Sequence, residues 1–262
     1  MLKCEIWHSL LKSQIEQLEV IDRILIRQIL GTHSKTGIEW LYIETGKFDI
    51  KSLVQIRRLM YWWHILSRKK SELIRRVYET QKISNNAGDW IKLIENDKRE
   101  LNIQMDEEDI QGVLQESFKN YIKSKVKTKF LQHLNNIKKN HSKSEYLNCQ
   151  ELRTAEYLNS PKFNTQQKQL LFRLRSRTLD VKMNFPGQHK DLLCISCGVY
   201  PESQGHLLQC PKLIANLGYL ADKTSKLNEY DIYGDIEKQQ FIVNIYSDIL
   251  EVRGKMKNGI EK

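Results

Sequence analysis

The sequence predicts an all-α protein that carries one small zinc knuckle near its C-terminal end. Apolar residues recur at i, i+3 and i+4 over long stretches, which is the pattern of the buried face of an amphipathic helix. The chain contains 12 Gly and 4 Pro among 262 residues, a composition that favours long helices over a turn-rich β architecture. It also lacks a β-hairpin signature, that is, two alternating apolar runs around a two-residue turn.

In the first half of the chain, helices are expected over residues 5–30, 36–46, 49–68, 71–81 and 90–100. Gly31 and Gly46 follow the last apolar positions of the first two helices and are typical C-terminal stop residues. Thr36-Gly-Ile-Glu39 matches a capping box that would open the second helix. Asp49 can cap the third helix, whose Met-Tyr-Trp-Trp-His segment is apolar almost all round and is therefore expected in a core.

In the second half, helices are expected over residues 114–139, 151–158, 165–182 and 236–255. Ser160-Pro161 breaks the second of these, and Thr165 is expected to cap the third. The acidic residues at 106–109 indicate a further helix start, because acids are stabilised at the positive end of the helix dipole. Residues 82–89 form the clearest loop and a candidate boundary.

Four residues form the pattern C-x2-C-x8-H-x3-C, namely Cys194, Cys197, His206 and Cys210. Three thiolates and one imidazole make a closed tetrahedral shell for Zn²⁺, which holds structure together and leaves no open coordination position. Gly198 suits a knuckle turn in which backbone N–H groups point at sulfur. His206 and Cys210 are four residues apart, so one helical turn places them on the same face, and Pro211 is expected to end that turn.

Two simpler interpretations of these residues are chance clustering and a disulfide with one spare thiol. Three of the five cysteines lie in this short segment beside a correctly spaced His, which favours the metal. Cys4 and His8 are also spaced i, i+4 and could bind metal or act as a nucleophile pair, although ordinary helix packing is the more common explanation. Cys149 is interpreted as a small buried hydrophobe.

The formal net charge of +10 favours a polyanionic partner, although charge alone does not choose between nucleic acid, a membrane surface and solubility. Between Lys119 and Lys143 the chain has eight lysines and no acidic residue. Two rows at i, i+4 spacing in this stretch are predicted to contact phosphates: Lys119, Lys123 and Lys127 in one row, and Lys125 and Lys129 in the other. A solvated helix face is the alternative interpretation.

A second basic cluster places three guanidinium groups within five residues beside an apolar stripe: Arg173, Arg175 and Arg177. The planar fork of Arg can bond two phosphate oxygens at once, which suits it to nucleic-acid backbone. Lys182 completes the predicted nucleic-acid-binding set. The aromatic residues 61–63 could stack on bases, but core packing is the alternative that their apolar surroundings favour.

Signatures of catalysis are missing from the sequence. It has no Asp-Asp pair to hold two Mg²⁺ ions, no G-x-x-x-x-G-K-[ST] phosphate loop, no H-E-x-x-H and no G-x-S-x-G. We therefore expect no catalysis by this chain alone. The first residues lack the apolar region of a secretion signal, and the longest apolar stretch, residues 59–66, is too short to span a bilayer. The thiol usage fits a reducing compartment, the nucleus or the cytoplasm.

Several short segments occur in an order that covers nearly the whole chain: His33-Ser-Lys-Thr36, Glu39-Trp-Leu-Tyr-Ile-Glu-Thr-Gly46, Arg57-Arg-Leu-Met-Tyr-Trp-Trp-His-Ile-Leu66, Gly88-Asp-Trp90, Tyr157-Leu-Asn-Ser-Pro161, Leu174-Arg-Ser-Arg177 with Asp180-Val-Lys182, His206-Leu-Leu-Gln-Cys210, Tyr230-Asp-Ile-Tyr-Gly-Asp235 and Leu250-Glu-Val-Arg253. In these segments the chain resembles the region that follows the palm in reverse transcriptases of LINE-type non-LTR retrotransposons. The family's fingers and palm, with their catalytic aspartates, have no counterpart here. The final spacing of the knuckle also differs from the x4 gap of some relatives.

The resemblance implies four regions: a helical, thumb-like region over 1–85, a helical basic connector over 86–190, a CCHC zinc knuckle over 191–212 and a helical tail over 213–262. It implies a non-catalytic module that binds template or target RNA or DNA beside a separate polymerase palm, with Zn²⁺ as structural cofactor. The alternative function is a zinc-stapled helical scaffold for a protein partner, without nucleic-acid binding.

Overall fold

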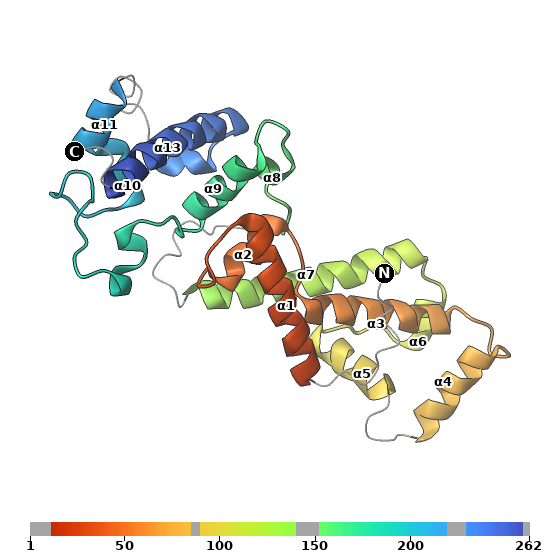
Figure 1. The fold of residues 1–262 in the computed structure, drawn as a ribbon. Helices are drawn as coiled ribbons and strands as arrows, with labels where there is room; N and C mark the ends of the chain where they lie inside the picture. The colour runs from red at the N-terminus through yellow and green to blue at the C-terminus, as the bar shows by residue number, and fades with distance from the viewer. Residues whose placement is uncertain (1–11, 85–89, 140–151, 219–228, 259–262) are drawn as a thin grey trace. The chain divides into compact units, whose positions relative to one another are not determined.

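The computed structural model describes residues 12–84, 90–139, 152–218 and 229–258, and within them the protein is all-helical, as predicted (Figure 1). Its only β-type pairings in these residues are two isolated bridges, Thr45 with Thr154 and Leu193 with Pro201. The helices and 3₁₀ turns are α1 (Lys12–Leu30), α2 (Ile38–Thr45), α3 (Ile50–Leu66), α4 (Leu73–Ser84), α5 (Trp90–Glu100), α6 (Glu107–Gln111), α7 (Gln115–Lys139), α8 (Glu156–Asn159), α9 (Thr165–Arg175), η3 (Lys182–Asn184), η4 (Pro186–Gln188), α10 (Gln204–Gln209), α11 (Pro211–Asn216), η6 (Glu229–Tyr233) and α13 (Ile236–Lys257).

Several predicted helix ends are confirmed. Gly31 and Gly46 adopt the left-handed conformation, with φ of 58° and 64°, that a C-terminal glycine makes accessible. The Asp49 carboxylate accepts the backbone N–H of Ser52 and caps α3. The acidic residues at 106–109 open α6, where Asp106 and Asp109 form a reciprocal capping box. Cys4, His8 and Cys149 lie outside the described residues.

Several predicted helix boundaries are wrong; the helix expected over 151–158, for example, begins only at Glu156. The capping box at Thr36 does not form, because α2 begins only after Gly37 and the Thr36 hydroxyl pairs with that of Thr32. The cap of α9 is Asn164, one residue before the predicted Thr165, in a capping box with Gln167. The same helix ends at Arg175 rather than at residue 182.

The chain divides into two compact units. Unit 1 comprises Met1–Arg23 and Lys47–Leu152, and unit 2 comprises Ile24–Gly46 and Arg153–Lys262. These units do not coincide with the four sequence regions described above, which remain a prediction. Each unit has its own core, and the two cores are described separately.

Unit 1 is built around α3, which contacts α4, α5, α6 and α7. The apolar segment of α3 lies in the core, as expected: Trp62 is 1% exposed and donates its indole N–H to the Tyr78 hydroxyl. Tyr61 and Trp63 are half-buried and pack against this core. Along α7 the buried residues recur every four positions and face α3: Phe118, Ile122, Val126, Phe130 and Leu134.

Unit 2 packs α9, α8, α10, α11 and η6 around the long helix α13. Its core is formed by four α9 residues and five α13 residues: Leu170, Leu171, Phe172, Leu174, Ile242, Val243, Ile245, Tyr246 and Ile249. The bridge between Thr45 and Thr154 places the end of α2 beside the start of the second stretch of this unit. The knuckle is therefore attached to a rigid helical body.

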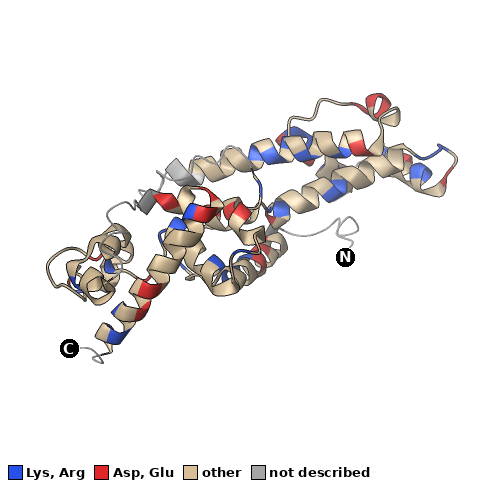
Figure 2. Ribbon diagram, turned by 90° about the horizontal axis from the view of Figure 1, so that it is seen from above, with Lys and Arg blue, Asp and Glu red and all other residues tan. Residues whose placement is uncertain are grey.

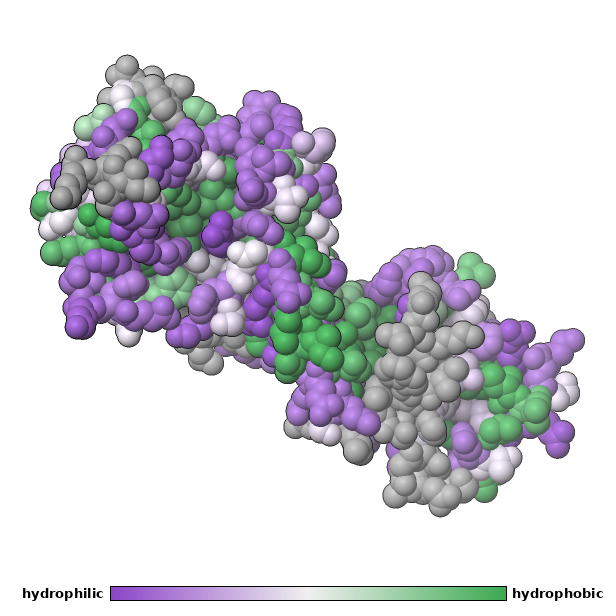
Figure 3. All heavy atoms as spheres, in the orientation of Figure 1, coloured by the Kyte–Doolittle hydropathy of each residue, from purple (hydrophilic) through white to green (hydrophobic). Residues whose placement is uncertain are grey.

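A row of apolar side chains on α1 is exposed to solvent, and Figure 3 shows it as hydrophobic surface over this helix. The row comprises Val20, Ile21, Ile24, Leu25 and Ile29. None of the helices described combines the length and apolar composition that a membrane span requires.

Backbone strain at the end of α9 gives a stability prediction. Arg177 has a φ of 55° in a Schellman motif, in which the N–H of Thr178 bonds the Arg173 carbonyl at 2.9 Å. A residue with a Cβ is disfavoured there, whereas Gly is not. We expect Arg177→Gly to be more stable than Arg177→Ala by about 1 kcal/mol, measured as the free energy of unfolding in urea. Because both variants lack the side chain, equal stabilities would contradict this account of strain.

Candidate metal centre

The predicted ligands Cys194, Cys197, His206 and Cys210 meet in unit 2, and their donor atoms all lie within 4.8 Å of one another. The Sγ atoms of Cys194 and Cys210 are 3.9 Å apart, and Cys197 Sγ is 3.4 Å from His206 Nε2. Zn–S bonds of about 2.3 Å and a Zn–N bond of about 2.0 Å at tetrahedral angles would separate two sulfurs by about 3.8 Å and a sulfur from a nitrogen by about 3.6 Å. The donor set therefore fits a tetrahedral Zn²⁺.

The first two ligands are placed by a tight backbone loop. The N–H of Cys194 bonds the Tyr200 carbonyl at 2.7 Å, and the N–H of Gly198 bonds the Cys194 carbonyl at 2.8 Å. Gly198 has a φ of 69°, so the residue after the second Cys needs the conformational freedom of glycine. This confirms the expected knuckle turn.

The other two ligands are placed by the short helix α10. Ser203 caps it by accepting the backbone N–H of His206, and Cys210 follows its last residue. The spacing of one turn puts the imidazole and the thiol on the same side, as predicted. Pro211 does not simply end this turn, because it occupies the first position of α11, where a missing N–H costs nothing.

Electrostatics around the thiols differ from one ligand to the next. Burial raises the pKa of Cys197, but the N–H groups of Tyr200 and Val199 and the His206 imidazole stabilise its thiolate, and the pKa falls to about 6. Burial and the neighbouring Cys194 sulfur raise the pKa of Cys210 to about 11. Three sulfurs converging in one buried site repel one another as thiolates unless a cation lies between them. A bound Zn²⁺ supplies that charge and keeps the thiols deprotonated.

The disulfide alternative does not fit this arrangement. All three cysteines are free thiols, and the 3.9 Å between the Cys194 and Cys210 sulfurs is far beyond a bond of about 2.05 Å. A cluster that converges this closely from two separate segments also argues against chance spacing. The metal interpretation is the one that the geometry supports.

A buried ion pair that the sequence did not reveal joins the knuckle to α13. Glu202 is 0% exposed and accepts two hydrogen bonds of 2.9 Å from the Arg253 guanidinium. The backbone N–H of Lys182 donates to the same carboxylate at 3.1 Å. Arg253 continues the buried row of Ile242, Tyr246 and Ile249 on α13, and a cation in such a row is the signal that could have indicated a buried partner.

Two further contacts hold α10 in place. The Gln204 side chain, 1% exposed, donates to the Leu174 carbonyl at 3.0 Å, and the Tyr246 hydroxyl donates to the Gln204 carbonyl at 3.0 Å. These bonds tie the helix that carries His206 to both α9 and α13. The metal centre is thus fixed in unit 2 by polar contacts as well as by its ligands.

The predicted phosphate-binding lysines lie on α7, where Figure 2 shows basic residues along the helix. Lys119 is paired with Glu116 at 2.9 Å, Lys125 donates to the Asn102 carbonyl at 3.3 Å, and Lys129 is paired with Glu100 at 3.0 Å. Lys123 and Lys127 form no ion pair with a described residue. In the row at 119, 123 and 127, Lys123 and Lys127 are therefore the two cations with the fewest partners inside the protein.

The arginine cluster has a different character. Arg175 is largely buried: it pairs with Glu44 at 2.9 Å, donates to the Ile232 carbonyl at 2.9 Å and lies over the Tyr233 ring. This guanidinium joins α2, α9 and η6 within unit 2, which is a packing role. Arg173 and Arg177 are half-buried near the end of α9.

The last predicted phosphate contact, Lys182, has its own internal partner. Its ammonium group pairs with Asp191 at 2.7 Å. The structure brings Lys182 close to the knuckle but leaves the α7 lysines in unit 1. The nine predicted residues are therefore divided between the two units.

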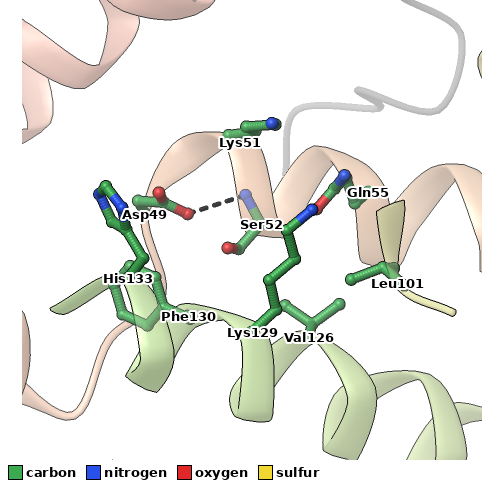
Figure 4. A pocket seen from close by; sticks show the side chains of 9 residues that line it. All are labelled: Asp49, Lys51, Ser52, Gln55, Leu101, Val126, Lys129, Phe130 and His133. Carbon is green, nitrogen blue, oxygen red and sulfur yellow. Dashed lines mark hydrogen bonds between the residues drawn. The ribbon is translucent and has the colours of Figure 1, made fainter. Parts of the chain in front are cut away.

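A cavity of about 160 Å³ lies between the start of α3 and the middle of α7 (Figure 4). Its apolar wall is formed by Leu101, Val126 and Phe130, and Lys51 and Lys129 are among its polar lining. Both ammonium groups lie 3.0 Å from one oxygen of Glu100. Burial raises the pKa of this carboxyl, but the two lysines outweigh burial and hold it at about 2. The ammonium groups of Lys51 and Lys129 are thus already paired with Glu100.

The first prediction for the centre concerns the metal itself. We expect purified reduced protein to hold one Zn²⁺ per chain, and Cys197→Ser to lose it together with the protease resistance of residues 191–212, because metal binding and local folding are one event in small sites. The measurements are metal analysis and limited proteolysis. The control is Cys149→Ser, which removes a thiol outside the pattern; if both variants retain zinc equally, the ligand assignment fails.

A second prediction concerns the anchor of the knuckle. Arg253→Leu leaves the Glu202 carboxylate buried without its partner and should lower the free energy of unfolding by about 3–5 kcal/mol. Adding Glu202→Gln should recover much of the loss. Lys255→Ala removes an exposed pair with Glu251 on the same helix and should cost less than about 1 kcal/mol. Equal effects of the two single substitutions in thermal or urea unfolding would refute the anchoring role.

Comparison with known proteins assigns no family to the chain: no protein-family model, no curated protein and no solved structure matches it. The metal centre is therefore characterised by its own donor set and geometry.

Proposed function

We propose that the protein is a non-catalytic, zinc-stapled helical module that binds the sugar–phosphate backbone of RNA or DNA, and that it is the counterpart of the C-terminal region of a LINE-type reverse transcriptase. Its residues would position a template or target strand and carry out no chemistry themselves. A separate polymerase palm would supply the catalysis. The module would work in a reducing compartment, the nucleus or the cytoplasm, where the three thiols stay available to Zn²⁺.

The observation that carries this proposal is the composition of the solvent face of α7. The buried stripe that begins at Phe118 is flanked on each side by lysines, because residues one position before or after a buried position lie about 100° around the helix. Between the two rows the outer face is uncharged and polar: Asn120, Ser124 and Thr128 are all exposed. The hydroxyls of Ser124 and Thr128 donate to backbone carbonyls of α7. An uncharged polar face between two rows of ammonium groups lets phosphate oxygens approach both rows.

The absence of acid on this face strengthens the argument. From residue 117 to the end of α7 at Lys139 the helix has no Asp or Glu. On a merely solvated helix, acidic and basic side chains usually alternate and pair at i, i+4. A long face of one sign is stabilised by a partner of the opposite sign, as the regular charge of a nucleic-acid backbone provides.

Four of the segments on which the resemblance is based meet in unit 2. Glu44, Tyr157, Arg175 and Tyr233 come from four of those segments and lie in one network, in which Arg175 pairs with Glu44 and contacts both tyrosine rings. Residues that share a packing role are expected to be retained together in related proteins. This convergence supports the proposed relationship.

A protein-interaction scaffold is the second candidate function. The observation that favours it is the exposed apolar row on α1, in which Ile29 is 69% exposed. Apolar surface of this kind is suited to a protein partner. Co-purification of a partner that resists nuclease treatment, together with a lack of salt-dependent nucleic-acid binding, would favour the scaffold.

A salt titration with matched variants tests the proposal. We expect the affinity of the full-length protein for single-stranded and duplex DNA and for RNA to fall steeply with salt. The magnitude of the slope of log K against log[salt] should decrease by about 1.4 to 1.8 in Lys123→Ala/Lys127→Ala, because each phosphate contact contributes about 0.7 to 0.9. Fluorescence anisotropy with labelled oligonucleotides measures both quantities.

The matched control comes from the same helix. Lys119→Ala/Lys125→Ala removes two ammonium groups that have internal partners and should change the slope by less. Binding that does not depend on salt in the unmodified protein would refute the backbone-binding proposal. Loss of affinity for one sequence only would contradict backbone contact and indicate base recognition instead.

A further inference from the structure

The zinc knuckle carries an exposed apolar patch that the fold does not use. The patch comprises Leu193, Val199 and Tyr200, which are 43%, 64% and 57% exposed. These residues lie next to the metal ligands Cys194 and Cys197 in the sequence. Because these side chains lie at the rim of the module, polar residues could replace them without loss of core packing. We therefore interpret the patch as a contact surface for a partner.

The backbone holds this patch rigidly. Leu193 pairs with Pro201 in an isolated bridge, which places the residues on either side of the loop next to each other. The Tyr200 carbonyl accepts the N–H of Cys194 at 2.7 Å, and the N–H groups of Val199 and Tyr200 point at the Cys197 sulfur. An aromatic ring on such a backbone loses little conformational entropy when a partner stacks on it.

The ring of Tyr200 is supported on one side and open on the other. Its centroid lies 5.6 Å from that of the His206 imidazole, at an interplanar angle of 45°. The metal ligand thus supports the ring, while more than half of the side chain remains in contact with solvent. This is the geometry of a stacking platform whose position depends on the metal centre.

The charges around the patch indicate the kind of partner. Lys190 and Lys212 are exposed at the two ends of the knuckle and form no ion pair with a described residue. The acidic residues of the knuckle are neutralised internally, since Asp191 pairs with Lys182 and Glu202 pairs with Arg253. A knuckle that presents an exposed aromatic ring and two cations without ion pairs complements a partner that combines flat rings with negative charge.

We propose that the knuckle stacks unpaired bases of single-stranded RNA or DNA on Tyr200, with Val199 and Leu193 extending the apolar surface and Lys190 and Lys212 contacting the adjoining phosphates. The inference rests on the proposed nucleic-acid function and specifies the strand type that this part of the chain binds. The bases of a duplex are already stacked on one another, so they do not stack on Tyr200. Every base has an aromatic face, so the contact is tolerant of sequence.

The test compares Tyr200→Ala with Tyr200→Phe in the full-length, zinc-loaded protein. Tyr200→Ala should weaken binding to oligo(dT) by about 5- to 150-fold, whereas Tyr200→Phe, which keeps the ring, should bind like the unmodified protein. Affinity for a hairpin duplex of equal length should change little. Leu114→Ala, at a 77% exposed apolar position outside the knuckle, is the matched control and should leave both affinities unchanged.

The salt dependence separates this inference from the proposed function. Stacking is not electrostatic, so Tyr200→Ala should lower affinity at every salt concentration, including 1 M, without altering the slope. If Lys123→Ala/Lys127→Ala leaves the salt slope unchanged but Tyr200→Ala weakens oligo(dT) binding at 1 M salt, the stacking inference stands and the backbone proposal for α7 fails. If the slope is steep but Tyr200→Ala binds like the unmodified protein, the stacking inference is overturned and the patch is assigned to an apolar protein partner.

The zinc content of each variant is measured to show that the knuckle is intact. If Tyr200→Ala loses the metal, Tyr200→Leu replaces it, since Leu retains apolar contact with His206 but has no planar face. Weakened oligo(dT) binding by zinc-loaded Tyr200→Leu supports the inference. Unchanged binding by this variant overturns it.

Discussion

The convergence of three sulfurs and one imidazole nitrogen within 4.8 Å is the feature on which this account of the C-terminal half of the protein depends. Between residues 191 and 203 the chain forms no helix and contributes few side chains to the core of unit 2. A loop of this composition has little apolar burial to offset the entropy of ordering it. A metal bound by the four ligands would supply that free energy and would link the loop to α10 and to the start of α11. The Glu202–Arg253 pair joins this segment to α13.

Several basic side chains of this protein carry a charge but already pair with other groups of the fold. Several basic side chains that the sequence predicts to contact phosphate are engaged within the fold, and Arg175 is the clearest example. Lys129 shares an acidic oxygen with Lys51. Lys123 and Lys127 on α7 remain without an ion pair to a described residue.

The sequence predicted the features that depend on local spacing, and it missed those that depend on distant partners. The metal ligands, the stop at Gly46 and the cap at Asp49 are each determined within a few residues. By contrast, Arg175 and Glu44 are 131 positions apart, and Glu202 and Arg253 are 51 apart. An arginine beside an apolar stripe looks the same in sequence whether it faces solvent or a buried carboxylate. Tertiary packing decides between these two roles, and the periodicity of the sequence does not predict tertiary contacts.

The central claim is that the four side chains hold one tetrahedral Zn²⁺. X-ray absorption at the zinc K-edge of the purified, reduced protein tests it most directly. The account predicts a first shell of three sulfurs at about 2.3 Å and one nitrogen at about 2.0 Å. A shell composed only of oxygen and nitrogen, or one with two sulfurs and an open position occupied by water, would contradict it.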